Sequence, residues 1–112
     1  MPITKGIKQL CAEAEAEIET WTPEQAMEQL GKDGVTFIDI RDIRELWRDG
    51  AVPGAVHVPR GMLEFWVDPE SPYGKDVFQS GNRFVFFCAG GLRSALATKA
   101  VQDMGLKPVC HI

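Results

Sequence analysis

Two short runs of apolar residues constrain the fold of this chain of 112 residues more than any other feature. Residues 35–40 and residues 84–88 consist almost entirely of aliphatic and aromatic side chains. The first run holds Asp39 near its end, and the second ends at Cys88. Strands that are apolar on both faces are typical of a parallel sheet covered by helices on both sides. The two runs therefore predict buried strands in an α/β domain.

The segments around these runs predict helices and short strands in alternation. Thr22-Pro23-Glu24-Gln25 is a capping box with proline in the first helical turn, and we expect its helix to end near Gly31. Residues 5–17 carry apolar side chains at helical spacing, among them Ile7 and Leu10. Further helices are expected at residues 42–48, 61–67 and 94–104, further strands at residues 55–58 and 109–112, and an irregular segment at residues 68–82. This order favours one α/β domain with a mostly parallel central sheet and helices on both faces.

Composition and cysteine usage exclude several functional classes. The formal net charge of −4 leaves no broad basic face, and no stretch is long enough to span a bilayer, so we expect neither nucleic acid nor a membrane as a partner. The cysteines lie far apart without a Cys-x-x-Cys pair, which argues against a disulfide framework and a structural zinc site. Free thiols fit a reducing compartment and the N-terminus shows no secretory signal, so the expected location is cytoplasmic.

The segment that points most directly to chemistry is Cys88-Ala89-Gly90-Gly91-Leu92-Arg93-Ser94. It follows a buried strand and precedes a helix, and ligands of open α/β sheets bind beyond the carboxyl ends of the strands. Two adjacent glycines allow a tight turn that exposes N–H groups, and such groups at the start of a helix stabilise anions. Together with the cation of Arg93, they would lower the pKa of the thiol and keep it as a thiolate near neutral pH. The alternative interpretation is a buried and inert cysteine.

This segment and two others resemble the rhodanese family. Residues 88–93 are similar to the family's six-residue active-site loop, and Asp39-Ile40-Arg41 is similar to its Asp-aliphatic-Arg signature. Residues 50–59 are similar to its Gly-x-x-Pro-Gly-Ala-x-His-aliphatic-Pro signature. The three segments occur in the family's order. The resemblance implies a rhodanese-like α/β domain over residues 19–112, and residues 1–18 remain as an N-terminal helical extension.

The resemblance also implies a sulfurtransferase whose catalytic residues are Cys88 and Arg93. The Cys88 thiolate would take sulfane sulfur from a thiosulfate-like anion as a persulfide and pass it to a thiol or cyanide acceptor. Asp39 and Arg41 would form an ion pair that positions the loops around the site, the interpretation that we favour, or else an ordinary surface ion pair. No metal or organic cofactor is required. The residues expected to bind the substrate are Ala89, Gly90, Gly91, Leu92 and Ser94.

Two other functions stay open on the sequence alone. Phosphatases and arsenate reductases also combine a cysteine, amides and an arginine, but their usual loop has five residues between cysteine and arginine, and this chain has four. Non-catalytic rhodanese-like modules for binding or regulation commonly lack the cysteine that this chain keeps. His57 is interpreted as a structural histidine rather than the partner of a Cys–His hydrolase, and Cys11 and Cys110 as uninvolved in chemistry.

The C-terminal boundary departs from the family pattern. The chain stops at Ile112, where relatives continue through a Gly-Gly turn into a closing helix. We therefore expect a domain that is C-terminally incomplete. The uncovered apolar surface of its sheet would favour self-association.

Overall fold

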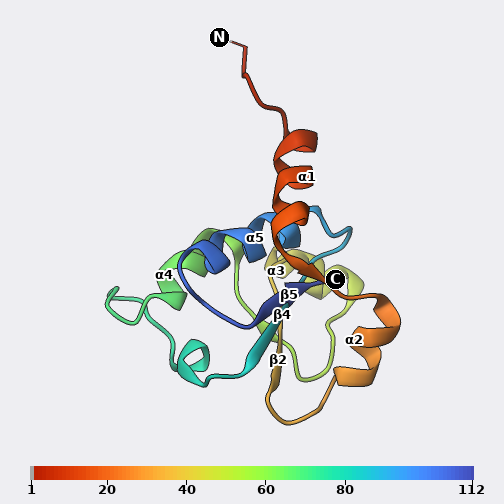
Figure 1. Cartoon of the computed structure of the whole chain (residues 1–112). Coiled ribbons are helices and arrows are strands. Elements are labelled where there is room, and N and C mark those ends of the chain that lie inside the picture. The colour runs from red at the N-terminus through yellow and green to blue at the C-terminus, as the bar shows by residue number, and fades with distance from the viewer. Residues whose placement is uncertain (1) are drawn as a thin grey trace.

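The computed structural model describes residues 2–112, which form a five-stranded parallel sheet with helices packed around it (Figure 1). The order across the sheet is β1-β5-β4-β2-β3, and each neighbouring pair runs parallel. The two apolar runs form β2 and β4, which pair with each other in the interior of the sheet, as predicted. The strands are β1 (Glu19–Thr20), β2 (Val35–Asp39), β3 (Val56–His57), β4 (Arg83–Phe87) and β5 (Val109–His111).

Five α-helices and two 3₁₀-helices connect the strands within residues 2–112. The predicted capping box begins α2: the Thr22 hydroxyl oxygen accepts from the Gln25 amide at 3.1 Å, and the Gln25 side chain accepts from the Thr22 amide at 2.8 Å. None of these helices is long and apolar enough to cross a membrane. The helices are α1 (Ile7–Glu17), α2 (Pro23–Gln29), α3 (Ile43–Asp49), η1 (Arg60–Met62), α4 (Leu63–Val67), η2 (Asp76–Gln79) and α5 (Leu92–Asp103).

The apolar residues of β4 divide the core into two layers. Successive side chains of a strand point to opposite faces, so Phe84 and Phe86 pack on the side of α4 and α5, while Val85 and Phe87 pack on the side of α2. Figure 1 shows α2 across the sheet from α4. The predicted architecture, a parallel sheet with helices on both faces, is therefore confirmed. It also explains why both central strands read as continuous apolar runs.

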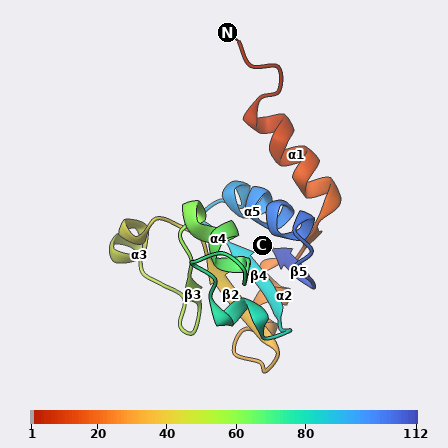
Figure 2. The ribbon, with the colours of Figure 1, turned by 90° about the vertical axis from the view of Figure 1, so that its left-hand side faces the viewer.

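The N-terminal helix forms as predicted but is covered on little of its apolar face. α1 lies along α5, and its N-terminal end points away from the body of the domain (Figures 1 and 2). The helix buries only small side chains, Cys11 and Ala14, whereas Ile7 and Leu10 are exposed. Spacing predicts which residues share a face of a helix, but it does not predict how much of that face another element covers.

The outer edge of the sheet was not evident from the sequence. Strand β1 is only two residues long and pairs Glu19 with Cys110 and Thr20 with His111. The Trp21 amide extends this pairing by donating to the carbonyl oxygen of His111 at 2.8 Å. Strand β5 is therefore an inner strand, held between β4 and β1. So short an edge strand carries no periodicity from which a sequence could predict it.

Candidate active site

Cys88 lies at the carboxyl end of β4, in the turn that leads into α5. The helix begins at Leu92, two residues earlier than expected, so Arg93 and Ser94 belong to its first turn. Gly91 precedes the helix with φ of +87°, in the left-handed region that a residue with a side chain rarely adopts. This sharp turn brings the start of the helix back over the end of the strand.

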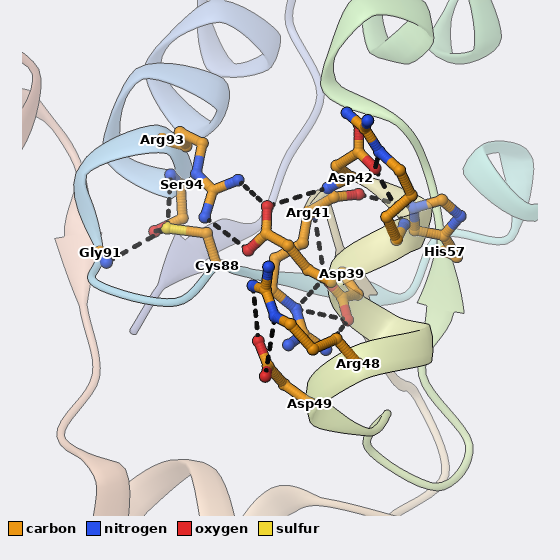
Figure 3. Close-up of polar contacts among 12 residues, drawn as sticks. Asp39, Arg41, Asp42, Arg48, Asp49, His57, Cys88, Gly91, Arg93 and Ser94 are labelled. Atoms are coloured by element: carbon orange, nitrogen blue, oxygen red, sulfur yellow. Dashed lines mark hydrogen bonds and ion pairs between the residues drawn. The ribbon is translucent and has the colours of Figure 1, made fainter.

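The turn surrounds the Cys88 sulfur with hydrogen-bond donors (Figure 3). The amide of Gly91 donates to Sγ at 3.1 Å, and the amide of Ser94 donates at 3.4 Å. The Ser94 hydroxyl oxygen lies 3.6 Å from the same sulfur, within hydrogen-bonding distance. Two of the predicted binding residues, Gly91 and Ser94, therefore contact the cysteine. In the described residues, no hydrogen bond to the sulfur comes from Ala89 or Leu92. The pKa of Arg93 is raised mainly by Glu45 and also by its proximity to Cys88.

These donors change the acidity of the thiol. Partial burial raises the pKa of Cys88. Hydrogen bonds from the Ser94 hydroxyl and from the amides of Ser94, Gly91 and Gly90 lower it by more than burial raises it, so the pKa lies below its ordinary value. Burial raises the pKa of Cys110, on β5, to about 11. The two thiols differ because the sulfur of Cys88 lies at the start of a helix and that of Cys110 lies in the core.

Arg93 is held by a carboxylate that the sequence analysis did not single out. Its Nη1 and Nη2 atoms donate to the two carboxylate oxygens of Glu45 at 2.6 and 3.1 Å (Figure 3). This contact is the main reason that the pKa of Glu45 is lowered. Glu45 also closes a capping box with Asp42 at the start of α3. The Asp42-x-x-Glu45 pattern directly after β2 was the signal that could have placed Glu45 near the site.

Asp39 and Arg41 form a buried ion pair at the end of β2. The closest contact, from Arg41 Nη2 to Asp39 Oδ2, is 2.7 Å, and the side chains are only 11% and 2% exposed for Arg41 and Asp39 respectively. Arg41 Nη2 also donates to the carbonyl oxygen of Gly50 at 2.9 Å, which ties the end of β2 to the loop after α3. His57 Nε2 lies 2.7 Å from the carbonyl oxygen of Arg41, a contact that joins the segment after β2 to β3.

A pocket of about 410 Å³ opens beside the sulfur. Cys88 and Ala89 form one wall, and Arg41 together with residues 49–52 forms the opposite one. Leu92 lies elsewhere: it is exposed and borders a groove against α1. A small solute in this pocket would lie between the Cys88 sulfur and the loop that Arg41 holds. Its lining residues are Arg41, Asp49, Gly50, Ala51, Val52, Phe87, Cys88 and Ala89.

Substitution of Gly91 tests the geometry of the turn. A Cβ atom at Gly91 would require a strained left-handed conformation and would lie 3.4 Å from the carbonyl oxygen of Ile112. We expect Gly91→Ala to lower the free energy of unfolding by about 1–2 kcal/mol. It should also raise the pKa of Cys88, because the strained residue moves its amide away from the sulfur. The measurements are urea denaturation and the pH dependence of alkylation. Gly90→Ala is the matched control, since a Cβ there meets nothing within 4 Å; equal losses in both variants would contradict the prediction.

The different environments of the thiols predict selective alkylation. The rate at which iodoacetamide modifies Cys88 should rise with pH to a plateau, because the thiolate is the reacting form. The midpoint of this rise should lie below that of an ordinary cysteine, about 8.5, because the pKa of Cys88 is lowered. Cys110 should stay unmodified in the folded protein, since it is buried and its pKa is raised to about 11. Peptide mass spectrometry distinguishes the two sites. A midpoint for Cys88 at or above the ordinary value would refute the lowered pKa.

Comparison with known proteins agrees with this arrangement. The family model for the rhodanese-like domain matches residues 22–112, and comparison with curated proteins gives no match. A protein of unknown function from Rhodopseudomonas palustris, named a possible tyrosine phosphatase, is 56% identical with a TM-score of 0.93, and the alignment covers 100% of this chain and 86% of that chain.

Two further solved structures are sulfur-transfer proteins. The polysulfide-sulfur transferase homodimer of Wolinella succinogenes is 30% identical, with a TM-score of 0.63 over 93% of this chain and 74% of that chain. A single-domain sulfurtransferase of Saccharomyces cerevisiae is 20% identical, with a TM-score of 0.65 over 84% of this chain and 81% of that chain, a similarity of fold. The family model spans most of the chain and includes the turn that holds Cys88. The chain therefore belongs to the family of rhodanese-like domains.

Proposed function

We propose that this protein is a sulfurtransferase that carries sulfane sulfur as a persulfide on Cys88. The observation that carries the proposal is the convergence of the Gly91 and Ser94 amides on one sulfur atom. Such an arrangement stabilises negative charge on the nucleophile and, after transfer, on the sulfur bound to it. Membership of the rhodanese-like family and structural similarity to sulfur-transfer proteins support the same assignment.

The first half-reaction loads the cysteine. The Cys88 thiolate attacks the outer sulfur of thiosulfate, a new S–S bond forms, and the S–S bond within the donor breaks with its electron pair on sulfite. The products are a Cys88 persulfide anion and sulfite, so atoms and charge balance without an external oxidant. The pocket between Cys88 and the loop near Gly50 has room for the donor.

The second half-reaction transfers the outer sulfur from the Cys88 persulfide to an acceptor. A thiolate or cyanide attacks the outer sulfur of the persulfide, and Cys88 leaves as a thiolate. The product is a new persulfide or thiocyanate, and the enzyme returns to its starting state. A lowered pKa favours this step as well, because a thiol of lower pKa is a better leaving group.

The charges near the pocket favour recognition by amides together with one arginine. Arg41 is paired with Asp39, and Arg93 is paired with Glu45, so both guanidinium charges are already matched. In the described residues, the Gly91 and Ser94 amides of the turn donate to the Cys88 sulfur and not to a carboxylate. We infer that the sulfur end of the donor binds the turn and that its sulfonate end competes with Glu45 for Arg93.

A tyrosine phosphatase is the second candidate, because the similar protein from Rhodopseudomonas palustris carries that name. The turn argues against it. Four residues separate Cys88 from Arg93, one fewer than in the usual phosphate-binding loop, and a shorter turn suits one sulfur atom better than a tetrahedral oxyanion.

The decisive experiment is loading with thiosulfate followed by mass spectrometry. We expect the intact protein to gain one sulfur atom on Cys88 and to release sulfite, because the thiolate is the attacking group. Cys88→Ser should gain none, and the matched control Cys11→Ala should still be loaded. A native protein that is alkylated at Cys88 but takes up no sulfur would favour a binding module, and turnover of an aryl phosphate in place of sulfite release would favour the phosphatase.

Removal of the charge of Glu45 tests how the donor is bound. Glu45→Gln keeps the capping box of α3, because glutamine serves equally well at that position, but it releases Arg93 from its ion pair. We expect the KM for thiosulfate to fall roughly two- to fivefold, the worth of a partly exposed ion pair. Glu64→Gln, in the pair between Arg60 and Glu64, is the control that should leave KM unchanged. A higher KM in Glu45→Gln would mean that the ion pair positions Arg93 for the donor instead of competing with it.

A further inference from the structure

We propose that His111 is a positioning residue for Cys88 and acts through the hydroxyl group of Ser94. The proposal rests on the sulfurtransferase function above and adds a residue from a different element to it. Three side chains, from the turn after β4, from α5 and from β5, form one hydrogen-bonded series. Ser94 Oγ lies 3.6 Å from Cys88 Sγ and 2.9 Å from His111 Nδ1.

The inner part of the series is enclosed in the protein. Ser94 is 0% exposed and His111 is 2% exposed, so water does not compete for the contact between them. The second ring nitrogen of His111, Nε2, is buried and has no hydrogen-bond partner in the described residues. A buried imidazole with one nitrogen unpaired is costly, because buried polar atoms are nearly always hydrogen-bonded. Among the described residues, the only hydrogen-bond partner of the ring thus lies towards Cys88.

The direction of each hydrogen bond follows from counting protons. The Ser94 hydroxyl has one proton, and a thiolate at Cys88 can only accept. If that proton is donated to the sulfur, the Ser94 oxygen is left to accept from Nδ1–H of His111. His111 is then neutral with its proton on Nδ1, and Nε2 is a bare acceptor. The opposite tautomer would accept at Nδ1 and draw the hydroxyl proton away from the sulfur.

The surroundings keep the ring neutral. Burial lowers the pKa of His111, and the only opposing charge of note is that of Glu15 on α1. The charged groups on the side of the sulfur are Arg93, with its partner Glu45, and Arg41 and Asp49 across the pocket. A neutral donor at Nδ1 therefore orients the hydroxyl group at neutral pH without adding a charge to the site.

This arrangement assists both half-reactions. Cys88 is a thiolate when it attacks the donor and again when it leaves the acceptor. A hydroxyl proton aimed at the sulfur stabilises both states, since hydrogen bonds to an ionised partner are stronger than those between neutral groups. His111 touches neither donor nor acceptor. Its effect reaches the reaction only through the acidity of Cys88.

Four variants test the series, with the pKa of Cys88 as the readout. Ser94→Ala removes the hydroxyl, and His111→Gln moves the amide nitrogen to the position of Nε2. His111→Asn keeps an N–H donor at the position of Nδ1. Thr98→Val is the matched control, because the hydroxyl of Thr98 is also buried in α5 but has no partner in the described chain. The pKa is measured from the pH dependence of alkylation, which requires no sulfur transfer.

We expect Ser94→Ala and His111→Gln to raise the pKa of Cys88 by about 1, the scale of one hydrogen bond to a charged group. His111→Asn should stay close to the native value, as should Thr98→Val. An unchanged pKa in His111→Gln beside a raised one in Ser94→Ala would overturn the role of His111. The tautomer is checked in the native protein by ¹⁵N NMR of the imidazole, so the proposal is testable even if a variant does not fold. A proton on Nε2 would overturn it.

These outcomes separate the inference from the proposed function. If the pKa of Cys88 changes as expected but no persulfide forms, the role of His111 is supported and the sulfurtransferase assignment is wrong. If the persulfide forms but the pKa of Cys88 is the same in every variant, the assignment is supported and the role of His111 is wrong.

Discussion

The turn between β4 and α5 is the constraint on which the active site depends. Cys88 follows the carboxyl end of β4. Gly91, in its left-handed conformation, reverses the chain so that the amides at the start of α5 face the sulfur. Burial alone would make this thiol less acidic, and the hydrogen bonds reverse the sign of the effect. At Cys110 burial outweighs the lowering effect of Arg83 and raises the pKa of the thiol to about 11. The acidity of this thiol therefore depends on the Ser94 hydroxyl and on the direction in which the backbone N–H groups of the turn point.

The charges around the pocket are compensated in pairs. Arg41 is matched by Asp39 and Arg93 by Glu45, and the chain as a whole is acidic. Under the proposed function, an anionic sulfur donor would therefore gain little from long-range attraction and would depend on hydrogen-bond donors that are already oriented. The buried pair of Asp39 and Arg41 fits this interpretation, because its main effect is to tie the end of β2 to the loop at Gly50 that lines the pocket.

Sequence patterns predicted the parts of the molecule that depend on local physics. The apolar runs in β2 and β4, the capping box at Thr22 and the Gly-Gly turn after Cys88 each carry a short-range signal that the structure bears out. The contacts that the sequence analysis missed join residues far apart in the chain: Glu45 reaches Arg93 from another helix, and His111 reaches Ser94 from another strand. No spacing rule encodes such pairs, because they depend on how the strands are ordered in the sheet. The exposure of Ile7 has the same origin, since the coverage of α1 depends on its neighbours.

The short strand β1 has a consequence for how the sheet is completed. It lies on the outer edge of β5, so the strand that carries His111 is bonded along both sides and presents no open edge to another molecule. Strands β1 and β5 lie far apart in the sequence, and contacts between such distant segments form slowly, because a large loop must close first. His111 reaches Ser94 from a strand that pairs with β4 on its other side, and that pairing closes a much shorter loop. The imidazole can therefore take its place behind the sulfur before the outer edge of the sheet is closed.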